Sequence, residues 1–311
     1  MVIENLESTD MKLFESNIIS IHGDAGRKWL TDLPHMVENF AVAWRLSGLK
    51  PVDNLSYNYV LSGFRERQPV ILKLGLDIKD LNTEAAALNA FNGHGAVEVL
   101  DQTPGALLLE RATPGHSLKR FFPNQDDEAI VIASEVIRKL HRIPKINLQG
   151  FPTINDWLTS LDTNYEILGH YLPKARTLRN ELLSTMNNPI LLHGDLHHDN
   201  ILAHGNEWKI IDPKGVMGEL AYEVGCFIRN PIEAGCFIRH PTSQLLNSSN
   251  ALPIIKNRID GFAKYLNLDP DRILKWCFVQ SILAIVWTVE DNIDSTNFMH
   301  LTKIFDTLMV Q

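Results

Sequence analysis

The chain has 311 residues, of which 45% are hydrophobic and 21% are charged, and its formal net charge is −8. This composition suits one large or two medium globular domains and excludes a globally disordered chain. The acidic balance argues against a general nucleic-acid-binding protein, which usually carries an excess of basic residues. The three cysteines, Cys226, Cys236 and Cys277, form no C-x-x-C pair and no disulfide framework, so a reducing, cytoplasmic location is expected.

The first third of the chain predicts helix followed by a small antiparallel sheet. The stretch up to about residue 40 has a helical pattern, and Pro34 predicts that it forms two short helices. Residues 42–110 then predict a sheet with one inserted helix. Its parts are a hairpin at 58–64 and 69–75, an Ala-rich helix at 81–93, and two strands within 96–110 around a TPG turn.

The rest of the chain predicts mostly helices. Apolar residues recur at helical spacing in 126–143, the pattern continues through 154–172 and 174–186, and it returns from about 250 to the end. Strands that precede helices, without regular alternation, predict the α+β class. We place the domain boundary near Thr113, which gives an N-terminal unit at 1–112 and a C-terminal unit at 113–311.

No membrane or secretory segment is expected. Residues 1–16 lack a basic region followed by a continuous apolar run, so they do not form a signal peptide. The most apolar run, 276–289, is shorter than the roughly 20 residues that a bilayer requires, and it predicts a buried helix. A near repeat, GCFIRN at 225–230 and GCFIRH at 235–240, is too short for a solenoid, and no function is assigned to it.

The segment HGDLHHDNIL at 193–202 carries the densest polar chemistry. The residues that follow it, 201–212, predict a β-hairpin with a turn at Gly205, which would bring Asn200 and Asp212 together at its open end. Asp195 lies five residues before Asn200. One carboxylate, one carboxamide and a second carboxylate suit magnesium-assisted phosphoryl transfer, because Mg²⁺ prefers hard oxygen ligands.

A lysine that could hold nucleotide phosphates lies upstream. Lys73 stands inside an apolar strand, where its charge is costly unless it is paired. Glu84 follows eleven residues later in the Ala-rich helix. A strand lysine paired with a helix glutamate is the arrangement that kinases use to hold the phosphates of ATP.

Together these motifs resemble the catalytic elements of kinases. HGDLHHDN resembles the catalytic loop H-x-D-L-x-x-x-N, with Gly194 where protein kinases carry arginine, and IDPKG at 211–215 stands where they carry D-F-G. These departures are similar to the aminoglycoside phosphotransferases, in which H-G-D-x-x-x-x-N and I-D are the usual forms. Within that family the chain resembles the streptomycin 6-kinase and hydroxyurea-resistance kinase group over roughly residues 25–300.

This resemblance implies a protein kinase-like, two-lobed α+β fold, with a small antiparallel sheet and one helix in the first lobe and a larger, mostly helical second lobe. It also implies a catalytic base, two magnesium ligands and a set of residues around the nucleotide, with ATP as co-substrate. These are Asp195 as base, Asn200 and Asp212 as magnesium ligands, Lys73 on the α- and β-phosphates with Glu84 as its partner, Ser56 and Tyr57 near the tip of the phosphate loop, Glu110 and Ala112 in the adenine hinge, and His193 and Glu223 as supports of the catalytic loop. Lys214 would either reach a phosphate or be solvated.

The acceptor implied by the resemblance is an aminoglycoside such as streptomycin. Among the acidic residues Glu233, Asp260, Glu290, Asp291 and Asp294, the pair Glu290 and Asp291 is favoured as a binding patch for a cationic acceptor, together with Asp199 in the loop. The rival on the same fold is a housekeeping kinase for a choline-like amine, an amino sugar or a homoserine-like alcohol. A remoter rival is a nucleotide-binding protein without catalysis.

Two further readings are disfavoured. A protein kinase would need an A-P-E segment after Asp212. A zinc hydrolase would use His193, Asp195, His197 and His198, but the sequence offers no second His/Cys cluster, and His197 and His198 are expected to be exposed loop residues. The oligomeric state and the choice between ATP and GTP stay open.

Overall fold

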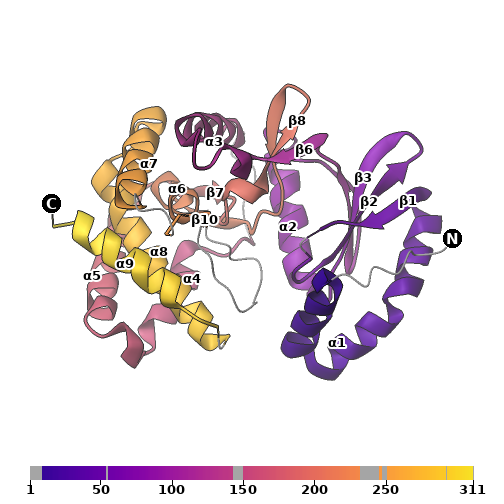
Figure 1. The fold of residues 1–311 in the computed structure, drawn as a ribbon, viewed down its shortest axis with the longest axis horizontal. Coiled ribbons are helices and arrows are strands. Elements are labelled where there is room, and N and C mark those ends of the chain that lie inside the picture. The colour runs from indigo at the N-terminus through magenta and orange to yellow at the C-terminus, as the bar shows by residue number, and fades with distance from the viewer. Residues whose placement is uncertain are drawn as a thin grey trace.

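The computed structural model describes residues 9–53, 55–142, 150–231, 245–246, 251–291 and 293–310. The chain forms two lobes that lie side by side, with the N-terminal elements in one and the C-terminal helices in the other (Figure 1). The order of strands and helices predicted the α+β class, and the two lobes are those that the kinase resemblance implied.

A five-stranded antiparallel sheet in the order β1-β2-β3-β5-β4 is the centre of the first lobe. The predicted hairpin at 58–75 is confirmed, because β2 and β3 pair from Tyr59 opposite Leu74 to Arg65 opposite Gln68. The inserted helix α2 lies between β3 and β4 in the chain. The elements are β1 Leu46–Pro51, β2 Tyr59–Arg65, β3 Gln68–Leu74, α2 Ile78–Phe91, β4 Val99–Thr103 and β5 Ala106–Glu110.

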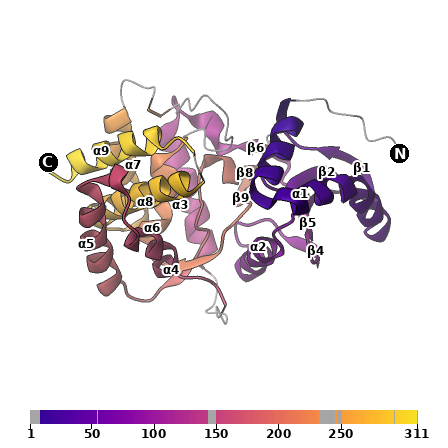
Figure 2. The same cartoon turned by 90° about the horizontal axis from the view of Figure 1, so that it is seen from below.

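The first helix, α1 (Thr9–Ala43), lies across one face of this sheet (Figure 2). Its break falls at Gly23, where φ is 55° and ψ is −128°, so the prediction of a break at Pro34 is wrong. Glycine alone adopts such a backbone at little cost, whereas Pro34 removes only one hydrogen bond from a helix held by packing. The Phe14 ring packs edge-on against Trp29 of the same helix and at a tilt against Tyr59 of β2, and so ties the helix to the sheet.

The second lobe is mostly helical, and its described residues contain five short strands. Its helices are α3 Asp126–Leu140, α4 Ile154–Leu158, α5 Tyr171–Ser184, α6 Leu220–Arg229, α7 Ala251–Leu266, α8 Pro270–Glu290 and α9 Thr296–Leu308. Its strands are β6 Pro114–Ser117, β7 Ile190–Leu192, β8 Ile201–His204, β9 Glu207–Ile210 and β10 Val216–Gly218. After Ala112 the chain leaves the five-stranded sheet, and β6 pairs with β8 instead. Buried residues of α2 and β5 belong to the same core cluster as the C-terminal helices. The core is therefore continuous across residues 112–113, and a domain boundary there stays a prediction.

The continuous helical pattern predicted over 154–172 is wrong in the middle. After α4 the chain makes short 3-10 turns at Thr159–Asp162 and Glu166–Leu168. Arg176 explains the break, because its guanidinium donates to the carbonyl oxygens of residues 161–163 at 2.7–3.1 Å. Such a side chain satisfies carbonyl groups that a continuing helix would otherwise have to bond.

The apolar run at 276–289 lies in α8. Among the described helices, α8 is the one that is long and apolar enough to cross a membrane, but 72% of its most apolar window is buried inside the protein. Trp276, Phe278 and Ile282 are fully buried. The helix is therefore the centre of the C-terminal core, as its sequence predicted. Glu233, Cys236 and the second copy of the GCFIR repeat lie outside the described residues.

Candidate active site

The loop at 193–200 runs between two short paired elements, strand β7 and the hairpin β8–β9. The hairpin predicted over 201–212 is present, with Ile201 opposite Ile210. Beyond this pair the Ile211 amide donates to the Asn200 carbonyl oxygen at 3.0 Å. Asp212 is the next residue, so the hairpin brings Asn200 and Asp212 to the same edge, close to the start of the loop.

Lys73 joins the two lobes at this edge. Its ammonium group lies 2.6 Å from Oε2 of Glu84 and also contacts Oδ1 of Asp212. Burial disfavours the charge of Lys73, but Asp212 and Glu84 outweigh burial and raise its pKa. Burial raises the pKa of Glu84, against the opposing effect of Lys73. Burial would raise the pKa of Asp212 as well, but Lys73 and Lys214 outweigh it and lower that pKa, so Asp212 stays ionised.

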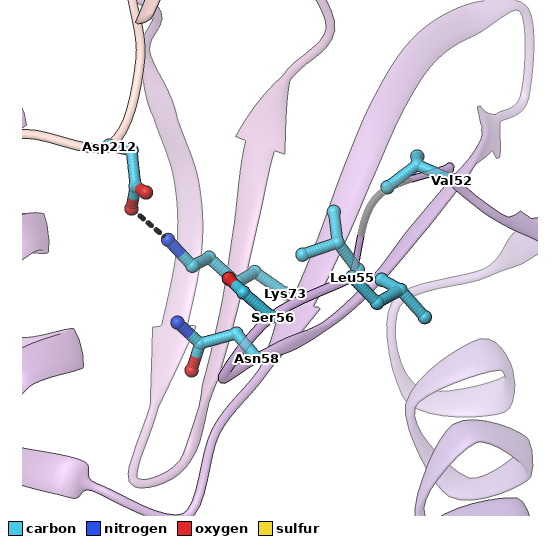
Figure 3. Close-up of a pocket in the computed structure, with 7 residues that line it drawn as sticks. Val52, Leu55, Ser56, Asn58, Lys73 and Asp212 are labelled. Atoms are coloured by element: carbon cyan, nitrogen blue, oxygen red, sulfur yellow. Dashed lines mark hydrogen bonds and ion pairs between the residues drawn. The ribbon is translucent and has the colours of Figure 1, made fainter. Parts of the chain in front are cut away.

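A pocket opens beside this ion pair under the β1–β2 loop (Figure 3). Its lining consists of Val52, Leu55, Ser56, Asn58, Val60, Lys73 and Asp212. Ser56 lines this pocket, and its carbonyl oxygen accepts from Asn17 of α1 at 3.4 Å, while its role at the phosphates stays a prediction. Tyr57 is 38% exposed and does not line the pocket. Asn58 was not singled out from the sequence, because the loop contains no glycine motif that would have marked it as a phosphate-binding loop.

Glu223 and His193 hold the start of the loop. The buried carboxylate of Glu223 accepts from the backbone amides of His193 at 2.9 Å and Gly194 at 3.1 Å. Burial raises the pKa of Glu223 to about 7, against these two donors. Burial lowers the pKa of His193 to about 4, so its ring is neutral. The ring donates from Nε2 to the Ile211 carbonyl oxygen at 2.8 Å and accepts from the Asp195 amide at Nδ1, 3.1 Å away.

Asp195 lies between these supports with a partly open carboxylate. Its side chain is 35% exposed, and its Oδ2 lies 3.8 Å from His197 Nε2. Its Oδ1 accepts from the thiol of Cys226 at 3.1 Å. Asn200 Nδ2 donates to the Asp195 carbonyl oxygen at 2.9 Å. The loop thus presents a carboxylate toward solvent from a backbone that is hydrogen-bonded on both sides.

The donor set around Asn200 and Asp212 fits a divalent cation with oxygen ligands. Because Asn200 donates through Nδ2, its Oδ1 is the atom left to ligate, and the Asp212 side chain remains 40% exposed. Among the described residues no group of three or more His, Cys, Asp or Glu side chains could hold a metal ion. One carboxylate and one amide with phosphate oxygens is the pattern of Mg²⁺ sites, not of zinc sites.

The expectation that His198 is exposed is wrong. His198 is fully buried, stacks on Phe227 with ring centroids 3.8 Å apart, and lies 4.0 Å from Asp126. Burial lowers its pKa to about 4, so the ring is neutral and packs as an aromatic group. His193 bonds backbone groups and His198 stacks on Phe227, so among the described residues these side chains do not gather into a zinc site.

The predicted hinge residues are close to the pocket but differ in their contacts. The Glu110 side chain pairs with Lys209 at 2.7 Å and His204 at 3.4 Å, and its backbone amide donates to the Glu98 carbonyl oxygen. Ala112 is buried, and among the described residues its backbone amide and carbonyl have no hydrogen-bond partner. Among the described residues, Ala112 is thus the one of the two whose backbone is left unbonded.

The predicted acceptor residues Asp199 and Glu290 share no contact partner among the described residues. Asp199 accepts from the Ser117 hydroxyl at 2.8 Å and lies 3.6 Å from Lys119. Glu290 accepts from the Tyr165 hydroxyl at 2.5 Å near the end of α8, and Asp291 is exposed at its C-cap. Asp199 thus has different partners from Glu290.

Solved structures with a similar architecture identify the fold. The chain resembles a thermostable mutant of aminoglycoside phosphotransferase APH(4)-Ia, with a TM-score of 0.61 and 12% identity over 88% of this chain and 97% of that one. It also resembles the choline kinase LicA from Streptococcus pneumoniae, with a TM-score of 0.64 and 12% identity over 88% and 98% of the two chains. The fold is therefore the protein kinase-like fold of small-molecule phosphotransferases.

Sequence comparison narrows the class further. The model of the aminoglycoside/hydroxyurea antibiotic resistance kinase family matches residues 48–292, and the chain belongs to that family. It is 26% identical to a streptomycin 3''-kinase of Klebsiella pneumoniae over 80% of this chain and 90% of that one. It is 24% identical to a streptomycin 6-kinase of Streptomyces glaucescens, over 86% and 87% of the two chains. The protein is thus an ATP-dependent phosphotransferase with an alcohol group as acceptor.

Proposed function

We propose that this enzyme transfers the γ-phosphate of ATP to a hydroxyl group of an aminoglycoside such as streptomycin, with Mg²⁺, in the cytoplasm. The observation that carries the proposal is the joining of Lys73, Asp212 and Asp195 at one edge, on supports that come from both lobes. The relatives named as streptomycin kinases support the choice of acceptor.

The nucleotide would occupy the pocket beside Lys73. Lys73 would contact the α- and β-phosphates, held in place by Glu84, and Ser56 would lie near the phosphates in this pocket. Tyr57 would follow Ser56 on the β1–β2 loop, outside the pocket lining. The backbone of Ala112 would pair with adenine. Asn200 Oδ1 and Asp212 would hold Mg²⁺, which neutralises charge on the triphosphate when bound.

Asp195 would orient the acceptor hydroxyl and accept its proton. As the hydroxyl oxygen forms a bond to the γ-phosphorus, the bond to the ADP oxygen breaks and the proton passes to the Asp195 carboxylate. Glu223 and His193 would keep the loop backbone in place during this step, because both are buried and bonded to it. The partly exposed Asp195 side chain supports this role, since the acceptor must reach it from solvent.

The acceptor would lie between the loop and the end of α8. A ring edge of Trp157 touches the backbone at Gly194, since a Cβ there would lie 2.8 Å from it. Trp157 in turn packs edge-on against Trp287, which is 39% exposed and lies one turn before Glu290 on the same helix. Aromatic faces and carboxylates together favour a cationic ligand, so Glu290 and Asp291 would contact the acceptor.

The test is an acceptor screen with Asp195→Ala as the matched variant. We expect the wild-type protein to consume ATP with streptomycin and to raise the streptomycin tolerance of a sensitive bacterium. Asp195→Ala should bind Mg-ATP normally but lose turnover by a factor of at least roughly 10². Unchanged turnover in Asp195→Ala would remove the base assignment. Turnover with choline, an amino sugar or homoserine, and none with streptomycin, would establish the housekeeping rival.

A further inference from the structure

Helix α6 contacts the catalytic loop at a second point, one turn after Glu223. Cys226 lies three residues beyond Glu223, so the two side chains leave the same face of the helix. Its Sγ atom lies 3.1 Å from Oδ1 of Asp195, and the residue is only 3% exposed. Glu223 therefore binds the backbone of the loop, while Cys226 contacts the carboxylate of Asp195.

The thiol must be the donor in this contact. An ionised carboxylate can only accept hydrogen bonds, whereas a thiol can donate one. Burial raises the pKa of Cys226 well above the ordinary range of a thiol, so its proton is retained. The helix fixes where the sulfur lies, because Asn230 donates to the Cys226 carbonyl oxygen at 2.8 Å and its Nδ2 lies 3.7 Å from Sγ.

We propose that Cys226 is a positioning residue for phosphoryl transfer, whose S–H holds Oδ1 of Asp195 and leaves Oδ2 to receive the acceptor hydroxyl. The proposal rests on the role of Asp195 proposed above. The partner of Oδ2 is different in kind: His197 Nε2 is 3.8 Å away, beyond hydrogen-bond distance, and its side chain is partly exposed. One carboxylate oxygen is thus engaged inside the protein and the other faces the side from which an acceptor arrives.

The contact with Asp195 distinguishes Cys226 from Cys277, the other cysteine among the described residues. Cys277 lies on α8, is 1% exposed, and has no contact with a carboxylate among the described residues. It offers a matched control for the loss of a buried thiol. The first copy of the GCFIR repeat thereby contains a residue at the reaction centre.

The experiment compares Cys226→Ala, Cys226→Val and Cys226→Ser with Cys277→Ala in the full chain. The assay measures ATP consumption with streptomycin, or with the acceptor of highest turnover in the screen if streptomycin is not used. Cys226→Ala and Cys226→Val should lower kcat roughly tenfold, because they remove a hydrogen bond to a charged group. The KM for ATP and the melting temperature of Cys226→Val should stay near wild type. Cys226→Ser should restore most of the turnover, since its hydroxyl can donate to Oδ1.

Three results would overturn the inference. Wild-type kcat in Cys226→Ala and Cys226→Val would show that the donor is not used. An equal loss of kcat in Cys277→Ala would show that only core packing is affected. No restoration by Cys226→Ser would show that donation is not the property that matters. The proposed function has its own test: full turnover in Asp195→Ala would contradict it, whatever the cysteine variants show.

Discussion

The buried ion pair at the junction of the lobes allows stability and catalysis to be separated. The informative change is Lys73→Met, which keeps much of the side-chain volume and removes the charge. Lys73 and Glu84 are 7% and 8% exposed, so the change leaves the carboxylate of Glu84 buried without its cation. Asp212 loses the same partner but remains 40% exposed and still has Lys214 nearby, so it stays ionised at little cost.

The cost of the change depends on pH. Breaking a buried ion pair by removing one partner costs about 3–5 kcal/mol. Glu84 can avoid part of this cost by binding a proton, because burial already raises its pKa to about 7 and losing Lys73 raises it further. When the pKa of a carboxyl group is raised by folding, the protein loses unfolding free energy as pH rises from the unfolded-state pKa to the folded-state pKa. The loss is about 1.4 kcal/mol per pH unit. In wild type this loss ends near pH 7, whereas in Lys73→Met it continues above pH 7.

The assay is chemical denaturation of Lys73→Met, Glu84→Gln and the double variant at pH 6, 7 and 8, with turnover measured on the same samples. We expect the double variant to recover most of the unfolding free energy that Lys73→Met loses. It should also lack the additional pH dependence of Lys73→Met. Turnover should remain at least roughly a hundredfold low, because the cation at the phosphates is absent. Lys174→Met, which removes the partner of Asp306 at 2.5 Å in the second lobe, should leave turnover unchanged. The reasoning is refuted if Glu84→Gln does not stabilise Lys73→Met, or if the double variant regains activity.

Two further predictions test the site, with Gly205→Ala as the control for the second, and a third tests the buried His141 at the C-cap of α3. Asp212→Asn should weaken Mg²⁺-dependent ATP binding by at least roughly tenfold, measured by calorimetry with and without Mg²⁺; a wild type that binds ATP equally without Mg²⁺ would contradict this role. Gly194→Ala should cost about 2–4 kcal/mol of unfolding free energy, because φ is +83° and the new Cβ would meet Trp157 at 2.8 Å. Gly205→Ala, with φ +56° and no atom within 4 Å, should cost about 1 kcal/mol by strain alone, and equal losses would argue against the clash. His141→Gln should make the protein less acid-sensitive: burial lowers the pKa of His141 to about 4, so up to roughly 3 kcal/mol is lost as pH falls from 6.5 to 4, and calorimetry showing the same acid loss in the variant would refute this.

Much of the first lobe follows from local sequence. The short β-branched runs, the TPG turn and the Ala-rich run are short-range signals, and the hairpin, helix and strands that they predicted are present at nearly the predicted positions. The position of Asp212 beside Asn200 follows from the hairpin alone, because a tight turn brings the outer ends of two strands together.

Elements that depend on distant partners were not predictable in this way. Pro34 is a strong helix breaker in isolation, yet α1 continues through it and breaks at Gly23, because packing against the sheet holds the helix. The helical pattern after α4 gave no sign of the 3-10 turns, which depend on the guanidinium of Arg176 from the next helix. Both errors arise because tertiary contacts outweigh local preference by a few kcal/mol.

The sequence by itself determined the chemical groups of this site: which carboxylates, amide and lysine are present, in which order, and in which kinase-like pattern. Only the tertiary structure decided their neighbours. It buried His198 against Phe227, gave Lys73 two carboxylates at once, and placed Cys226 against Asp195. The physical reason is that hydrogen bonds, burial and pKa values depend on atoms brought together from distant parts of the chain, whereas motif and spacing record only what lies nearby in sequence.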